Sequence, residues 1–171
     1  VQKDGKILVV DLQNHAIKRM DVDGTNIVTL NSTFDQPYGV AIQSDGKILV
    51  ANRRNSTIER MDADGTNKIT LGSGFSFPSR VAVQKDGKIL VADTNNNSIN
   101  SMDADGTNII TLGSGFIKPY DIAIQSDGKI VVADQGNNTI KRMDSDGSNI
   151  ETLSSDFFGP YGLAIQLDDK I

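Results

Sequence analysis

Four copies of an acidic motif are the most obvious candidates for chemistry in this sequence. The motif Asp-x-Asp-Gly-x-Asn places oxygen ligands at alternate positions before a Gly, which is typical of calcium-binding loops. The candidate calcium ligands are Asp21, Asp23, Asp62, Asp64, Asp103, Asp105, Asp144 and Asp146. A calcium hand also needs a later bidentate Glu, whereas a strand-like run of Ile, Thr and Leu follows here. We therefore favour a hairpin with a left-handed Gly and Asp side chains bonded to turn amides, and we predict no bound cofactor.

A second recurring pair is Asp-x-x-Asn. Its copies are Asp11/Asn14, Asp93/Asn96 and Asp134/Asn137. A catalytic site shared among repeats needs different residues from different repeats, whereas these side chains recur almost unchanged. We predict that they fix a turn by bonding backbone donors, and that the single imidazole, His15, is an exposed turn residue. No catalytic residue is predicted in this segment.

The composition excludes several other kinds of chemistry. The 171 residues contain no Cys, so disulfides, thiolate metal sites and cysteine nucleophiles are absent. A net charge of -5 argues against a nucleic-acid-binding surface. Only two of the 22 acidic residues are Glu, and this richness in Asp, together with 16 Gly, suits turns and disfavours helix interiors. This composition makes an all-β chain the first expectation. No apolar run approaches the ~20 residues of a membrane span, so we expect no such span.

Internal repetition then decides the predicted architecture. The triplet Asp-Gly-Lys recurs with its Gly always 41 residues apart, at Gly5, Gly46, Gly87 and Gly128. The same spacing aligns all four prolines and all four methionines. A period in the 40s with several short strands per unit is typical of propeller blades, and the helical patterns of other repeat proteins are absent.

Each repeat is predicted to form a four-stranded antiparallel blade. In the second repeat the expected strands cover 38–43, 47–51, 58–61 and 67–71, with Asp45-Gly46 as the first hairpin corner. The two inner strands are continuously apolar because both faces of a blade pack against neighbouring blades. The predicted fold is thus an all-β propeller of 41-residue blades, with repeats at about 1–37, 38–78, 79–119 and 120–160 and a partial repeat at 161–171.

The ends of the chain leave two arrangements open. Residues 1–7 and 165–171 occupy the same part of the repeat, so the chain overshoots four periods by seven residues. Either the segment belongs to a longer array, or the inner strand expected at 161–166 pairs with the unpaired first blade. We favour the longer array, with about four blades of a larger ring in this segment.

The repeat F-x-x-P-Y-G-V-A-I-Q-x-D-G-K-I-x-V-A-D-x-x-N-N resembles the NHL repeat, named for an Asn-His-Leu triplet, over the entire chain. The first unit carries Asn14-His15-Ala16. The departures are Asn52, where the other units have Asp, and Ser79-Arg80, where two other units have Tyr-Gly. The resemblance implies a propeller, commonly of six blades, that serves as a binding platform or, in some relatives, as a metal-dependent lyase or lactone hydrolase. Those lyases use several His, so this segment cannot assemble such a site alone.

Variation between the repeats concentrates in two loops, one before the inner strand and one between the second and third strands. In a propeller both loops open on the same face. This face carries the predicted binding residues Tyr38, Arg53, Arg54, Arg80, Lys118, Tyr120, Asp121 and Tyr161. Tyr and Arg dominate recognition hot spots, which favours a binding surface. The alternative is that these loop positions simply drift and the tyrosines pack over the rim of the ring.

We predict a non-enzymatic NHL-like propeller that acts as a protein- or glycan-interaction or structural module of a larger, extracellular protein. The alternative is part of a metal-dependent propeller lyase or lactone hydrolase whose catalytic residues lie outside this segment. A third hypothesis is a structural array that self-associates. The Asn, Thr, Ser and Gly richness, the lack of Cys and the glycosylation sequons indicate a secreted or cell-surface location in a bacterium or archaeon. The sequons begin at Asn31, Asn55, Asn96 and Asn137.

Overall fold

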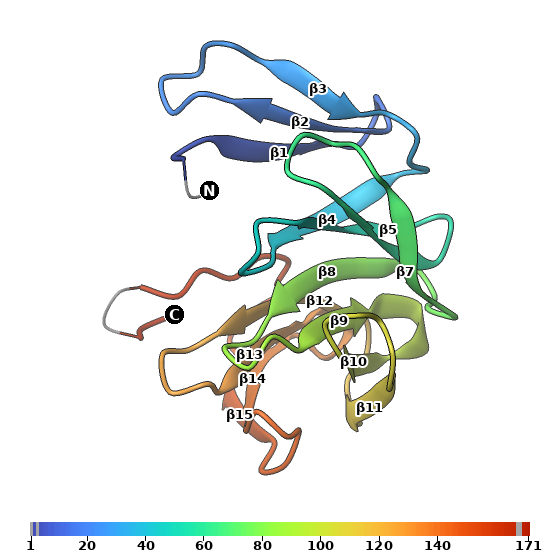
Figure 1. Cartoon of the computed structure of the whole chain (residues 1–171). Coiled ribbons are helices and arrows are strands. Elements are labelled where there is room, and N and C mark those ends of the chain that lie inside the picture. Colours follow the sequence, from blue (N-terminus) through green and yellow to red (C-terminus); the bar gives the residue numbers. More distant parts are fainter. Residues whose placement is uncertain (1, 3, 167–168) are drawn as a thin grey trace.

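The chain folds into four small antiparallel sheets arranged in an open arc in a computed structural model, which describes residues 2, 4–166 and 169–171 (Figure 1). We call the sheets blades 1 to 4 in chain order. Blade 1 is β1 (Ile7–Asp11), β2 (Ala16–Met20) and β3 (Val28–Asn31), and blade 2 is β4 (Pro37–Ile42), β5 (Ile48–Asn52), β6 (Thr57–Met61) and β7 (Ile69–Ser73). Blade 3 is β8 (Pro78–Val83), β9 (Ile89–Asp93), β10 (Ser98–Met102) and β11 (Ile110–Gly113), and blade 4 is β12 (Pro119–Ile124), β13 (Ile130–Asp134), β14 (Thr139–Met143) and β15 (Glu151–Ser154).

The predicted all-β architecture is confirmed, with strands paired in sequence order inside each blade. In blade 2, β4 and β5 pair with Ile42 opposite Ile48, and the Gln43 N–H donates to the Lys47 carbonyl to close the corner. Gly46 in this corner has a φ of 88°, which glycine adopts without strain. Helical structure in the described part of the chain is limited to two single turns, η1 (Thr94–Asn96) and η2 (Gln135–Asn137). No helix among the described residues has the length and apolar character needed to span a bilayer.

The hydrophobic core lies between successive blades. On β5, Leu49 and Ala51 pack in the cluster shared with blade 3, whereas Ile48 and Val50 pack in the cluster shared with blade 1. All five residues of β5 are fully buried, because successive side chains point to opposite faces and both faces are covered. This packing explains the continuous apolar runs of the inner strands.

The Asp-Gly corner between the third and fourth strands also joins the blades. A Cβ on Gly106 would lie 2.0 Å from the Leu71 carbonyl oxygen of the preceding blade, and Gly106 has a φ of 90°. Gly65 and Gly147 make equivalent approaches to Leu30 and Leu112. Only glycine satisfies both demands, so the repetition of this corner reflects blade-to-blade packing.

The C-terminal segment differs from the prediction of an inner strand at 161–166, because the structure assigns no strand there. Leu163 and Ile165 nevertheless pack on the outer face of blade 4, and the Gln166 N–H donates to the Lys170 carbonyl as in the other first corners. Among the described residues β1 pairs with β2 alone, and blades 1 and 4 lie at opposite ends of the arc (Figure 1). Residues 167 and 168 of the partial repeat lie outside the described residues.

Candidate functional site

The carboxylates of the Asp-x-Asp-Gly-x-Asn motifs are hydrogen-bonded within their own turns. Asp23 Oδ1 accepts from the backbone N–H of Thr25 at 3.0 Å and from its hydroxyl at 2.7 Å, which lowers the pKa of Asp23. Asp21 Oδ2 accepts from Asn26 Nδ2 at 2.7 Å. The same bonds recur in the other three motifs, at Asp62, Asp64, Asp103, Asp105, Asp144 and Asp146. Within the described part of the chain, no group of three or more His, Cys, Asp or Glu side chains is arranged to hold a metal ion.

In blades 3 and 4, the Asp-x-x-Asn pairs tie the turn after the second strand to the loop that enters the same blade. Asp93 Oδ1 accepts from the Ser76 backbone N–H at 2.6 Å, while Asn96 Nδ2 donates to Asp93 Oδ2 at 2.8 Å. In blade 4, Asp134 accepts from the Ile117 N–H at 2.7 Å. Bonding of backbone donors by these carboxylates, predicted from the sequence, is thus confirmed for Asp93 and Asp134.

His15 lies in the turn between β1 and β2 with a φ of 55°. Its side chain is 46% exposed, and its Nδ1 lies 3.1 Å from the Gln36 backbone N, where it accepts a hydrogen bond. The prediction of an exposed turn histidine is confirmed.

The predicted loop face contains an aromatic cluster built around one arginine. Arg53 Cζ lies 4.8 Å from the Tyr38 ring centroid and 5.6 Å from that of Tyr120. The Tyr38 and Tyr120 rings meet edge to face with their centroids 5.6 Å apart, and the Tyr161 ring centroid lies 4.0 Å from that of Tyr120. We call these residues, together with Phe77, the Tyr–Arg cluster. Contact of a guanidinium with several rings is a favourable cation–π arrangement.

Phe77 is a member that the sequence reasoning missed. Its ring centroid lies 5.3 Å from Arg53 Cζ, and it is 37% exposed. The same repeat position holds Gln36, Lys118 and Gly159 in the other blades. A large aromatic side chain at a position that is otherwise polar or Gly was therefore a signal available in the sequence.

Ser79 explains how rings from blades 2 and 4 meet across blade 3. It occupies the repeat position that holds Tyr38, Tyr120 and Tyr161 elsewhere, and it is 2% exposed. Its hydroxyl donates to the Tyr120 carbonyl at 2.7 Å. Because Ser is small, the intervening blade leaves room for the Tyr38–Tyr120 contact.

The remaining predicted binding residues do not join the cluster. Arg80 Nε lies 3.0 Å from Asp121 Oδ1, so these two form an ion pair beside it. Asp121 Oδ2 also accepts from the Leu163 N–H at 2.8 Å, which holds the C-terminal segment on blade 4. The side chains of Arg54 and Lys118 are exposed, and each residue instead anchors its loop through its backbone N–H.

The electrostatics of the cluster favour neutral phenols around a fixed positive charge. Burial raises the pKa of Tyr120, which is 7% exposed. The hydrogen bond with Tyr120 raises the pKa of Tyr161, whose ring is half exposed. Both phenols therefore stay protonated at neutral pH.

Four-stranded blades that pack face to face, with variable loops gathered at one end, define a β-propeller. The family model described as NHL repeat matches residues 75–99, so the resemblance read from the sequence is confirmed and the chain carries an NHL repeat. No curated protein matches the chain.

Solved structures of similar fold include both enzymes and a complex. Virginiamycin B lyase from Staphylococcus aureus is 24% identical with a TM-score of 0.81, over 99% of this chain and 59% of that one. A chain of a nidogen–laminin complex is 20% identical with a TM-score of 0.87, over 94% and 64% of the two chains. A putative gluconolactonase is 16% identical with a TM-score of 0.73, over 86% and 58%. The chain thus spans less than two thirds of the length of each of these structures.

Proposed function

We propose that this chain is a non-enzymatic part of an NHL-type propeller that binds a protein partner through the Tyr–Arg cluster. The proposal places the segment in a longer, extracellular protein whose further blades extend the arc. A rigid set of blades holds the cluster in position, so binding orders few side chains and loses little conformational entropy.

The observation that supports this function is the packing of Arg53 against three rings from three blades. Tyr and Arg are enriched at hot spots of protein interfaces, where amphipathic rings supply contact area and hydroxyl groups supply hydrogen bonds. Tyr161 is 54% exposed and Phe77 is 37% exposed, so the cluster offers apolar area at the surface. A chain of similar fold occurs in a nidogen–laminin complex, which is consistent with protein recognition.

The test compares Arg53→Ala with Arg142→Ala as a matched control. Arg142 pairs with Glu151 on the outer strands of blade 4, and neither residue belongs to the cluster. Each purified variant is used to capture proteins from the extracellular fraction of its source, and both melting temperatures are measured. We expect the captured protein to be retained by Arg142→Ala and lost with Arg53→Ala. Equal capture by both folded variants, or capture of glycans in place of protein, would contradict the proposal.

The alternative function is a metal-dependent lyase or lactone hydrolase whose catalytic residues lie in blades outside this segment. The observation that supports this alternative is the similar fold of a virginiamycin B lyase and a putative gluconolactonase. It predicts a stoichiometric divalent ion in the intact protein. Metal analysis before and after chelation distinguishes the two functions, because only the enzyme loses activity together with its metal.

A further inference from the structure

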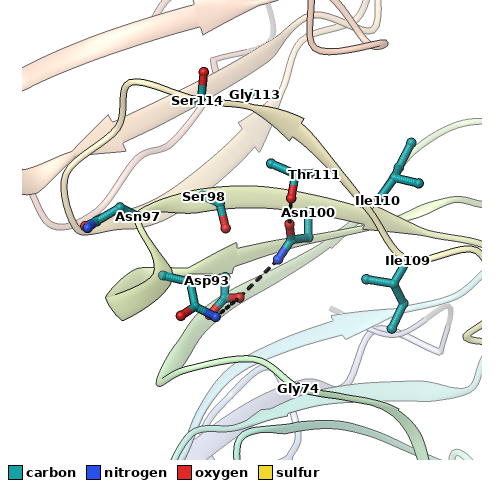
Figure 2. Close-up of a pocket in the computed structure, with 11 residues that line it drawn as sticks. Gly74, Asp93, Asn97, Ser98, Asn100, Ile109, Ile110, Thr111, Gly113 and Ser114 are labelled. Carbon is teal, nitrogen blue, oxygen red and sulfur yellow. Dashed lines mark hydrogen bonds between the residues drawn. The ribbon is translucent and has the colours of Figure 1, made fainter.

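A pocket of about 570 Å³ opens on blade 3, and none of the residues that line it belongs to the Tyr–Arg cluster. Gly74 lines it from the loop that precedes blade 3, Asp93 and Asn100 line it from β9 and β10, and Thr111 lines it from β11 (Figure 2). Asn100 Nδ2 donates to Asp93 Oδ2 at 3.0 Å, and Asn100 Oδ1 accepts from the Thr111 hydroxyl at 3.0 Å. The equivalent positions in blades 2 and 4 show which group occupies this space elsewhere in the repeat.

In blade 4 the equivalent space is filled by the ammonium group of Lys141. Its Nζ lies 2.7 Å from Asp134 Oδ2 and 2.6 Å from the Gly115 carbonyl oxygen, and it sits 5.2 Å from the Phe116 ring centroid. The Asp134 side chain is fully buried. One ammonium group thus meets a carboxylate, a carbonyl and a ring face.

Blade 2 builds the same ammonium environment from a different lysine. Lys68 Nζ lies 2.7 Å from Glu59 Oε2, 2.9 Å from the Thr33 carbonyl oxygen and 4.7 Å from the Phe34 ring centroid. Lys68 precedes β7, whereas Lys141 lies in β14, so the two lysines occupy different repeat positions. The environment therefore attracts an ammonium group irrespective of the strand that supplies it.

Blade 3 keeps this environment but supplies no lysine. Gly74 and Phe75 occupy the repeat positions of Gly115 and Phe116, and Asp93 occupies that of Asp134. The two positions that hold lysine in the other blades are Asn100 and Ile109 here.

Asp93 is consequently a buried carboxylate without a cation. It is 1% exposed, and no Lys or Arg of the described residues pairs with it. Burial raises the pKa of Asp93, and three hydrogen bonds oppose that rise only in part. A buried carboxylate gains from an opposite charge that also donates hydrogen bonds.

We propose that the blade 3 pocket binds a primary ammonium group of an external ligand. The ligand is an alkylammonium, either the side chain of a partner's lysine or a free small amine. Its nitrogen donates to the Asp93 carboxylate and to the carbonyl of Gly74, which is the equivalent of Gly115. Its alkyl chain lies along Ile109 and Ile110, which line the pocket and are 43% and 52% exposed. Three N–H donors match these acceptors, which a quaternary ammonium group cannot do.

The test is a titration of the ¹⁵N-labelled protein with n-butylammonium chloride, followed by NMR on the side-chain amides of Asn96 and Asn100. We expect saturable shifts for the wild type. Asp93→Asn should weaken binding about tenfold or more, since one charge-assisted hydrogen bond is lost. Asn100→Lys should abolish binding by filling the pocket as Lys141 does. Both residues already occur at these positions, as Asn52 in blade 2 and Lys141 in blade 4, so both variants are compatible with the repeat.

Asp45→Asn is the matched control, because it makes the same change at an exposed corner of blade 2. It should bind as the wild type does, and n-butyltrimethylammonium should bind about tenfold more weakly because it has no N–H donor. No saturable shift in the wild type, equal binding by Asp93→Asn, or equal binding of the trimethylated amine would overturn the proposal. Tighter binding of Nα-acetyl-lysine N-methylamide than of n-butylammonium identifies a polypeptide as the source, and the reverse identifies a small amine.

Discussion

Blades 3 and 4 share one strand arrangement but differ in a charge that is buried beside their second strands. In blade 4, Lys141 neutralises a buried Asp, whereas in blade 3 Asn100 leaves the equivalent Asp93 uncompensated beside an open pocket. The hydrogen bonds that hold the loops, from Ser76 to Asp93 and from Ile117 to Asp134, are the same in both. A repeat protein can therefore change the chemistry of one blade while the contacts that build the blade stay constant.

The largest expected effect comes from the glycines that pack blades 3 and 4 against their preceding blades, and it tests whether the two blades pack alike. Gly106→Ala and Gly147→Ala should each lower the free energy of unfolding by about 3–4 kcal/mol, because a side chain is forced into a left-handed conformation and against a carbonyl of the preceding blade. Urea unfolding of each variant measures the change.

Gly87→Ala and Gly128→Ala are the controls for this comparison. Both glycines have a φ near 90°, but nothing lies within 4 Å of a Cβ built on them. They should cost only about 1–2 kcal/mol, from the backbone conformation alone. Unequal losses for Gly106 and Gly147 would show that the blades differ in packing as well as in charge.

Removal of the blade 4 cation should have the next largest effect. Lys141→Met leaves the Asp134 carboxylate buried without its partner and should lower the free energy of unfolding by about 2–3 kcal/mol. Lys141→Asn copies blade 3 and should lose roughly half as much, since an amide again donates to the carboxylate. The Lys141→Asn variant should also bind n-butylammonium at a second site, and a single site in that variant would contradict the equivalence of the blades.

The reverse exchange in blade 3 should stabilise the protein. Asn100→Lys places an ammonium group beside Asp93 and should raise the free energy of unfolding by about 1 kcal/mol, a gain reduced by the ordering of the long side chain. Differential scanning calorimetry would detect this as a higher melting temperature. A lower melting temperature would show that the blade 3 pocket cannot accommodate a lysine.

The smallest expected effect is on pH dependence. Because burial raises the folded-state pKa of Asp93 above its ordinary value of 3.8, the folded state binds the proton more tightly than the unfolded state. The contribution of Asp93 to stability is therefore fully present below pH 3.8 and is lost as pH rises through the raised pKa. As pH rises from 3.8 through the raised pKa, the free energy of unfolding of the wild type should therefore fall relative to that of Asp93→Asn. Urea unfolding at several pH values measures this difference. A difference that does not change with pH would contradict a raised pKa.

Much of the fold was predictable because the repeat makes each signal occur four times. The corners at Asp45-Gly46 and its equivalents and the apolar inner strands such as β5 follow from local preferences and alternation. The expected strand at 161–166 was wrong, because a strand needs a hydrogen-bonded neighbour and no described segment pairs with these residues. Loop variation also pointed to Tyr38, Arg53, Tyr120 and Tyr161, which the structure brings together.

The sequence by itself determined the blade period, the strand order within a blade and the loops that vary. These features depend on contacts between residues that are close along the chain. Only the tertiary structure decided that Phe77 joins the Tyr–Arg cluster, that Gly106 must approach the preceding blade, and that Asp93 faces a pocket without a cation. These contacts join segments of different blades or strands, and whether a buried charge is compensated depends on which side chains packing brings within a few ångströms of it.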